Sequence, residues 1–162
     1  MLALGDALAV ALLEARGFSA EDFARSHPGG NLGRQLLLHV ADVMRTGDQL
    51  PRTSPDAPLV QGLLEITGKG MGMTAVIENE RVAGIFTDGD LRRALENRVD
   101  AHATSMRTVM TPQPRTVRPG ALAAEAARLM ETHNITALLV VDEQQRLVGA
   151  LNVHDLMRAG VV

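Results

Sequence analysis

The residues best suited to chemistry lie in two short polar segments of the same design. Thr87-Asp88-Gly89-Asp90 places a hydroxyl three residues before a carboxylate, and Asn152-Val153-His154-Asp155 places an amide at the equivalent position. Each segment follows a short apolar run and precedes a short helical pattern. A side-chain oxygen followed by a carboxylate three residues later is typical of a helix capping box.

Two interpretations of these segments stay open. In the first, Thr87 and Asp90 only satisfy backbone N–H groups at the start of a helix. In the second, the same helix start attracts a phosphate, the threonine hydroxyl donates to that phosphate, and the aspartate accepts from two ribose hydroxyls. Asn152 replaces the threonine in the second segment, so a phosphate contact is less well supported there.

Both segments belong to an internal repeat with an offset of about 65 residues. Val43-Met44 recurs as Val109-Met110. The other matches are Pro51-Arg52-Thr53 with Pro114-Arg115-Thr116, Val76-Ile77-Glu78 with Val140-Val141-Asp142, Arg81–Gly84 with Arg146–Gly149, and residues 90–94 with residues 155–159. We therefore predict two modules, over residues 41–100 and 106–162.

Each module should contain a short strand, a long helix, two strands and a short helix. The first copy predicts helices over 59–67 and 88–96 and strands over 52–53, 73–77 and 82–86. The second copy predicts strands over 115–116, 135–141 and 147–151 and a helix over 153–159. Its long helix has Leu122, Ala126, Leu129 and Met130 on one face. A module of about 55 residues buries little surface alone, so we expect the two sheets to share one core.

The composition restricts the possible partners. Sixteen Lys and Arg against nineteen Asp and Glu give a net charge of −3, which argues against a nonspecific nucleic-acid binder. The chain has no cysteine, which fits the cytoplasm, and no apolar run of membrane-spanning length. The histidines lack metal-ligand spacing, so we predict no metal site. Three Phe without Trp or Tyr leave little aromatic surface for stacking on a base.

The repeat resembles a tandem pair of cystathionine β-synthase-type (CBS) domains, a Bateman module. The resemblance covers residues 41–162 and rests on the two Val-Met pairs and on the segments Gly84–Asp90 and Gly149–Asp155. It implies an α+β fold with two βαββα copies in a pseudo-symmetric pair and a nucleotide in the cleft between them. By position, the ligand would meet Thr87 and Asp90 in one site, Asn152 and Asp155 in the other, and Met71, Gly72, Met73, Ile135, Thr136 and Ala137 around the base.

The chain before residue 40 differs from the repeat. Residues 3–14 predict a helix that is apolar nearly all round and needs a partner, and Ser19 predicts the start of a second helix. Leu4–Leu8, Ser26–Gly30 and Leu32–Arg34 resemble the end of a sugar isomerase (SIS) domain as it joins a CBS pair in the bacterial arabinose 5-phosphate isomerase family.

That second resemblance implies a parent enzyme which interconverts D-arabinose 5-phosphate and D-ribulose 5-phosphate for synthesis of the lipopolysaccharide sugar Kdo. His27 would be catalytic only in the intact enzyme, where proton transfer suits a group that titrates near neutrality. Because the sequence lacks most of an isomerase core, we expect this chain alone to be inactive. Residual isomerase activity would have to depend on His27.

Three functions remain open. The first is a regulatory pair that binds CMP-Kdo, with the ribose at Asp90, the phosphate at Thr87 and the sugar carboxylate at Lys69 or His133. The second is a sensor of AMP or ATP, and the third is a structural module that holds an oligomer together without a ligand. Lys69 and His133 are otherwise solvated cations at helix ends. No cofactor is required, and the expected partners are the SIS domain and further copies of the chain.

Overall fold

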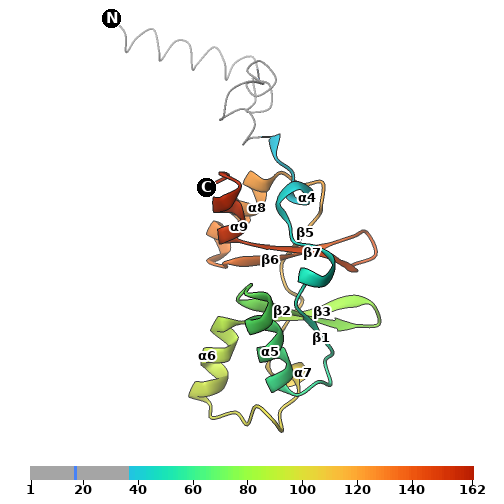
Figure 1. Cartoon of the computed structure of the whole chain (residues 1–162), viewed down its shortest axis with the longest axis vertical. Helices are drawn as coiled ribbons and strands as arrows, with labels where there is room; N and C mark the ends of the chain where they lie inside the picture. Colours follow the sequence, from blue (N-terminus) through green and yellow to red (C-terminus); the bar gives the residue numbers. More distant parts are fainter. Residues whose placement is uncertain (1–16, 18–36) are drawn as a thin grey trace, which may run out of the picture.

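The computed structural model describes Gly17 and residues 37–162 of the chain. Two modules follow one another along the molecule, each with a small sheet and its own helices (Figure 1). The helices predicted over 3–14 and from Ser19, and the candidate catalytic residue His27, lie outside the described residues. In the part of the chain that the structure describes, no helix is long and apolar enough to cross a membrane.

The first module has the predicted order of elements. Strand β1 pairs in parallel with β2, and β2 pairs antiparallel with β3. Gly70 ends the long helix α5 in the left-handed region at φ 60°, where glycine carries no Cβ penalty. The bounds are β1 Arg52–Thr53, α5 Leu59–Lys69, β2 Met73–Glu78, β3 Arg81–Thr87 and α6 Asp88–Glu96.

The second module repeats this arrangement, with β5 parallel to β6 and β6 antiparallel to β7. The bounds are β5 Thr116–Val117, α8 Ala123–His133, β6 Ala137–Val141, β7 Leu147–Asn152 and α9 Val153–Arg158. Two predicted strand starts are wrong. Asn134 ends α8 at φ 50°, so Ile135 and Thr136 form a turn before β6, and Arg115 precedes β5.

The two sheets pack face to face around a shared apolar core, as predicted. Alternate residues of a strand point to opposite faces, so Ala75 of β2 lies in the shared core while Val76 packs with the helices of its own module. In β6, Leu139 lies in the shared core and Leu138 packs in the cluster with α8 and α9. Both faces of the middle strands are covered, so β6 is apolar along its length and β2 has Thr74 and Glu78 as its only polar residues.

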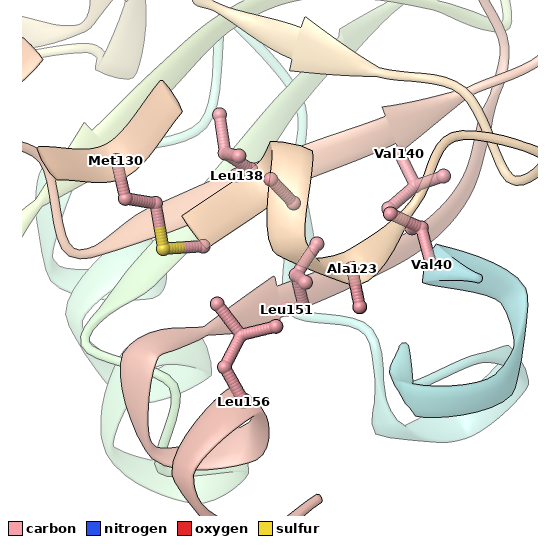
Figure 2. Packing of buried hydrophobic residues seen from close by; sticks show 8 residues of the cluster. Val40, Ala123, Met130, Leu138, Val140, Leu151 and Leu156 are labelled. Atoms are coloured by element: carbon pink, nitrogen blue, oxygen red, sulfur yellow. The ribbon is translucent and has the colours of Figure 1, made fainter. Parts of the chain in front are cut away.

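The modules exchange two short linker helices, and neither these helices nor their exchange was predicted from the sequence. Helix α4, Val40–Val43, lies at the start of the first repeat in sequence but packs on the second module, where Val40 is fully buried in the cluster that Figure 2 shows. Helix α7, Met106–Val109, lies at the start of the second repeat but packs on the first module, where Met106 is fully buried. Figure 1 shows α4 with the second module and α7 with the first.

Each linker also extends the sheet on which it packs. Strand β4, Thr111–Pro112, follows α7 and pairs antiparallel with β3. After α4, Arg45 forms an equivalent antiparallel bridge with Ala150 of β7, with backbone hydrogen bonds of 2.8 and 3.1 Å. A 3-10 turn, Gly47–Gln49, then leads toward β1. Residues 45 and 111 are thereby brought to the strand–helix junctions of the opposite modules.

Candidate functional site

A cleft of about 1080 Å³ lies between the modules at the start of α6; we call it the first cleft. One wall is the polar segment after β3, and the other is the turn between α8 and β6 of the second module. The lining residues are Gly72, Ile85, Thr87, Asp88, Gly89, Asp90, Arg92, Arg93, Thr111, Gln113, Pro114, Arg115 and His133–Ala137. Its volume is that of a small-molecule site.

Thr87 caps the helix that begins in this cleft. Its Oγ1 accepts the N–H of Asp90 at 3.3 Å, and Asp90 Oδ2 accepts the N–H of Thr87 at 2.8 Å, so the capping box is formed. The Thr87 hydroxyl also donates to Asp90 Oδ2 at 2.7 Å. The N–H of Asp88 donates to the carbonyl oxygen of Gly72 at 3.1 Å, which ties the start of α6 to the turn before β2.

The Asp90 carboxylate is buried, and two further donors reach it. Thr111 of β4 donates its hydroxyl to Asp90 Oδ1 at 3.0 Å, and Arg93 of α6 donates to the same oxygen. The Arg93 side chain is 65% exposed, so its guanidinium can move into water without leaving a buried cation behind. Asp90 can therefore exchange this partner for hydroxyl donors of a ligand.

Basic groups surround the first cleft. Arg92 and Arg115 line it from the two modules, and His133 lies at the end of α8. The lining contains Arg92, Arg93 and Arg115 against the two carboxylates of Asp88 and Asp90, and this small excess of positive charge favours an anionic ligand. Among Gly17 and residues 37–162, no group of three or more His, Asp or Glu is placed to hold a metal ion.

A second cleft of about 610 Å³ lies at the equivalent junction of the second module. Its lining residues are Val43, Met44, Arg45, Asp48, Gln49, Gly68, Lys69, Asp155 and Arg158. Asn152 caps α9 as Thr87 caps α6, because its Oδ1 accepts the N–H of Asp155 at 3.0 Å and Asp155 Oδ2 accepts the N–H of Asn152 at 3.2 Å. The Asn152 amide also donates to the carbonyl oxygen of Met71 at 3.5 Å.

The guanidinium of Arg45 is bound to the carboxylate of the second cleft. Its Nε lies 3.1 and 3.2 Å from the two carboxylate oxygens of Asp155, and its Nη2 lies 3.0 Å from Oδ1. Its Nη1 donates to the carbonyl oxygen of Lys69 at 3.1 Å. The Arg45 and Asp155 side chains are 21% and 5% exposed, so this is a largely desolvated, charge-assisted contact.

The structure distributes the predicted site residues over three places. The first cleft contains Gly72, Thr87, Asp90, His133, Ile135, Thr136 and Ala137. The second contains Lys69 and Asp155, with Asn152 capping the helix beside them. Met71 and Met73 are buried in the core shared by the sheets. Of the two cations proposed for a ligand carboxylate, only His133 shares a cleft with Thr87, whereas Lys69 donates to the carbonyl oxygen of Asp48.

The sequence analysis gave no role to Arg45, Thr111 or Arg115. Arg45 and Thr111 both follow a repeated Val-Met pair, so the repeat marks them as equivalent positions. The exchange of linkers, which brings each of them to a junction in the other module, is not visible in the local pattern.

The chain belongs to the CBS domain family, because the family model matches residues 40–97 and again residues 106–162. These two matches correspond to the two repeated modules of the fold, so the chain carries a tandem CBS pair. The repeat and the junction segments had indicated this class.

The whole chain is similar to arabinose 5-phosphate isomerase KdsD. It is 59% identical over 162 residues to that protein of Pseudomonas aeruginosa, covering 99% of this chain and 50% of the relative. It is 56% identical to that of Escherichia coli K12, covering 99% of this chain and 49% of the relative. The chain thus spans about half the length of the curated relatives it matches.

Solved structures of CBS proteins have the same fold. CBSX2 in complex with AMP superposes with a TM-score of 0.65 at 25% identity, covering 76% of this chain and 96% of that chain. A CBS domain protein from Pyrobaculum aerophilum complexed with AMP has a TM-score of 0.66 at 20% identity, covering 77% and 100% of the two chains. The second likeness concerns the fold alone.

Proposed function

We propose that this CBS pair is a regulatory module that binds a nucleotide-type ligand in the first cleft. The observation that carries the proposal is that Thr87 and Asp90 of one module line the same cleft as residues 133–137 of the other. A ligand there touches both modules at once. Binding therefore stabilises one relative position of the modules, which is what a sensor needs to transmit a signal.

The groups in the cleft match the parts of a nucleotide. The start of α6 and the Thr87 hydroxyl suit a phosphate, the Asp90 carboxylate suits the two ribose hydroxyls, and the turn before β6 offers apolar surface through Ile135 and Ala137. Arg92 and Arg115 add positive charge at the cleft wall. The lining contains no Phe, Trp or Tyr.

CMP-Kdo is our first candidate ligand. The similarity to arabinose 5-phosphate isomerase KdsD supports a place in Kdo and lipopolysaccharide synthesis, where the activated sugar would act as an end-product signal. In the first cleft its ribose would meet Asp90, its phosphate Thr87 and its sugar carboxylate His133. AMP or ATP is the alternative, supported by the AMP complex of the similar structure CBSX2. CMP-Kdo, AMP and ATP are all anionic. They would be met in the cytoplasm, where we propose that the protein is located.

We further propose that the pair regulates an isomerase domain in the same protein. The relatives, named as isomerases, are about twice as long as this chain. The predicted SIS-like segment, with His27, lies before the pair in the sequence. We expect the described modules to bind ligand without isomerising the sugar phosphate, since neither cleft is lined by the parallel sheet and phosphate-binding loops of such an enzyme.

A thermal-shift titration with CMP-Kdo, CMP, AMP and ATP tests the proposal. A ligand at 100 times its Kd stabilises the folded state by about 2.7 kcal/mol and should raise the Tm by roughly 5–10 °C. A larger shift with CMP-Kdo than with CMP identifies a sensor of the sugar, and a shift only with AMP or ATP identifies an energy sensor.

Asp90→Ala and Asp155→Ala are matched variants for this titration, because each removes one capping-box carboxylate. We expect Asp90→Ala to abolish the ligand shift and Asp155→Ala to keep it, although both lower the Tm. A ligand shift that survives Asp90→Ala would contradict binding in the first cleft. No shift in the parent chain with any of the four compounds would favour the structural function.

Exposed apolar side chains support oligomer formation as a second function. Leu64 of α5, Leu95 of α6 and Met157 of α9 are 68%, 66% and 57% exposed, and they lie on helices of both modules. We propose that further copies of the chain cover them. Sedimentation velocity should show a dimer or larger species that Leu64→Glu with Leu95→Glu dissociates, while Gln144→Glu, in the exposed turn between β6 and β7, has no effect. A monomeric parent chain would contradict this proposal.

A further inference from the structure

The two clefts differ most in the residue that each linker presents to the capping aspartate. Arg45 and Thr111 follow the repeated Val-Met pairs, and each contacts the aspartate of the opposite module, Asp155 and Asp90 respectively. Threonine uses one hydroxyl at 3.0 Å, whereas arginine uses two nitrogens at 3.0–3.2 Å. The same position of the repeat therefore makes a small contact in one cleft and a bidentate ion pair in the other.

The exposed arginines do not account for this difference. Arg93 and Arg158 occupy equivalent positions one turn after the two aspartates, and both side chains are largely in water, at 65% and 77% exposed. Arg158 Nη1 lies 3.9 Å from Asp155 Oδ1, which is a loose ion pair. Only the second cleft has a further, mostly buried guanidinium on its carboxylate.

We propose that Arg45 closes the second cleft to nucleosides and so makes the pair a single-site binder. This inference rests on the proposed function of the first cleft and assigns a stoichiometry to it. Arg45 occupies both oxygens of Asp155, which would otherwise accept the two ribose hydroxyls. Its Nη1 also donates to the carbonyl oxygen of Lys69 in the first module, so the guanidinium spans the cleft between Lys69 and Asp155.

Displacing Arg45 would be costly for an incoming ligand. The guanidinium is already largely desolvated and each of its three nitrogens donates a hydrogen bond, and breaking a buried ion pair leaves its partner charge unpaired. Two neutral hydroxyls do not replace a bidentate cation on a buried carboxylate. In the first cleft the ligand displaces the solvent-exposed Arg93 and the neutral hydroxyls of Thr87 and Thr111, so no buried cation has to leave the Asp90 carboxylate.

The test exchanges the two linker residues and counts bound nucleotide by isothermal titration calorimetry, with CMP-Kdo and AMP as separate probes. The parent chain should bind one nucleotide, Arg45→Thr should bind two, and Thr111→Arg should bind none. Two nucleotides on the parent chain, or one on Arg45→Thr, would overturn the single-site proposal while leaving the proposed function intact. No nucleotide on any of the three chains would overturn both.

A measurement without ligand tests the closing contact itself. We expect Arg45→Thr and Asp155→Asn each to lower the Tm, and the double variant to lower it by clearly less than the sum of the two, because both remove the same contact. Arg158→Thr combined with Asp155→Asn is the matched control and should be nearly additive. Additive losses for Arg45 and Asp155 would show that the ion pair does not form in solution, which overturns the proposal whatever the nucleotides do.

Discussion

The side chain of Met110 lies directly over Gly84, although the two residues belong to different repeats. A Cβ atom added to Gly84 would meet Met110 Sδ at 2.5 Å and the Thr111 carbonyl oxygen at 3.0 Å. Met44 lies over Gly149 in the same way. These contacts fix the exchanged linkers on the edges of the sheets, and through them residues 45 and 111 reach the two clefts.

The close approach at Gly84 predicts that Gly84→Ala is destabilising. The added methyl group must push away a methionine and a backbone carbonyl, and overpacking of this kind costs about 1–3 kcal/mol in the free energy of unfolding. Gly68→Ala is the matched control, because nothing lies within 4 Å of its added Cβ and alanine favours the helix by about 0.5–1 kcal/mol. Urea denaturation measures both; equal stability of the two variants would contradict the close approach.

The exchange of linkers predicts that Val40→Ala perturbs the second module rather than the first. Val40 is fully buried in a cluster with Leu138 and Leu151, and loss of its two methyl groups should cost about 1–3 kcal/mol. Amide chemical shifts should change mainly in α8, β6 and β7. Met106→Ala, the equivalent variant, should change those of α5 and β2. Perturbation of the first module by Val40→Ala would rule out the exchange.

The hydroxyl contact between Thr111 and Asp90 predicts a modest stability effect. Thr111→Val keeps the shape of the side chain and removes one hydrogen bond, which contributes about 0.5–1.5 kcal/mol. Thr108→Val removes an exposed hydrogen bond of 3.2 Å between the Thr108 and Ser105 hydroxyls, which water can replace, and should have a smaller effect. Thermal unfolding compares the two. A larger loss for Thr108→Val would show that Thr111 does not support the carboxylate.

The turn between β6 and β7 predicts a pH-dependent contribution to stability. The backbone N–H of Arg146 donates to Asp142 Oδ1 at 2.8 Å and its guanidinium to Oδ2 at 2.9 Å, which lowers the pKa of the Asp142 carboxyl. Because this pKa is lower in the folded chain, the contribution is present above the unfolded-state pKa and is lost as the pH falls through the folded-state pKa.

Carboxyl ¹³C chemical shifts measure this pKa directly. We expect a midpoint for Asp142 below the ordinary value of 3.8. Arg146→Ala removes the guanidinium but keeps the backbone donor, so the pKa should rise only part of the way. A midpoint at or above 3.8 in the parent chain would contradict the hydrogen bonds of this turn.

Local pattern was sufficient to predict the strand, helix, two strands and helix of each module and both capping boxes, but not α4, α7 or β4. The apolar runs of β2 and β6 and the oxygen–carboxylate spacing at Thr87 and Asn152 are local signals, and the structure contains them as predicted. The exchange of α4 and α7 depends on which module offers the better cavity for Val40 and Met106, which is a tertiary property. For the same reason, the sequence did not show that Lys69 and Thr87 lie in different clefts.

The most direct test of the central claim is an amide chemical-shift titration of the ¹⁵N-labelled chain with CMP-Kdo and, separately, with AMP. We predict that at least one of them gives saturable shifts at residues 87–93 and 133–137, the two walls of the first cleft. Residues 45 and 152–155, around the second cleft, should change little. Shifts confined to the second cleft, or no saturable shifts with either compound, would contradict nucleotide binding between Thr87, Asp90 and the turn before β6.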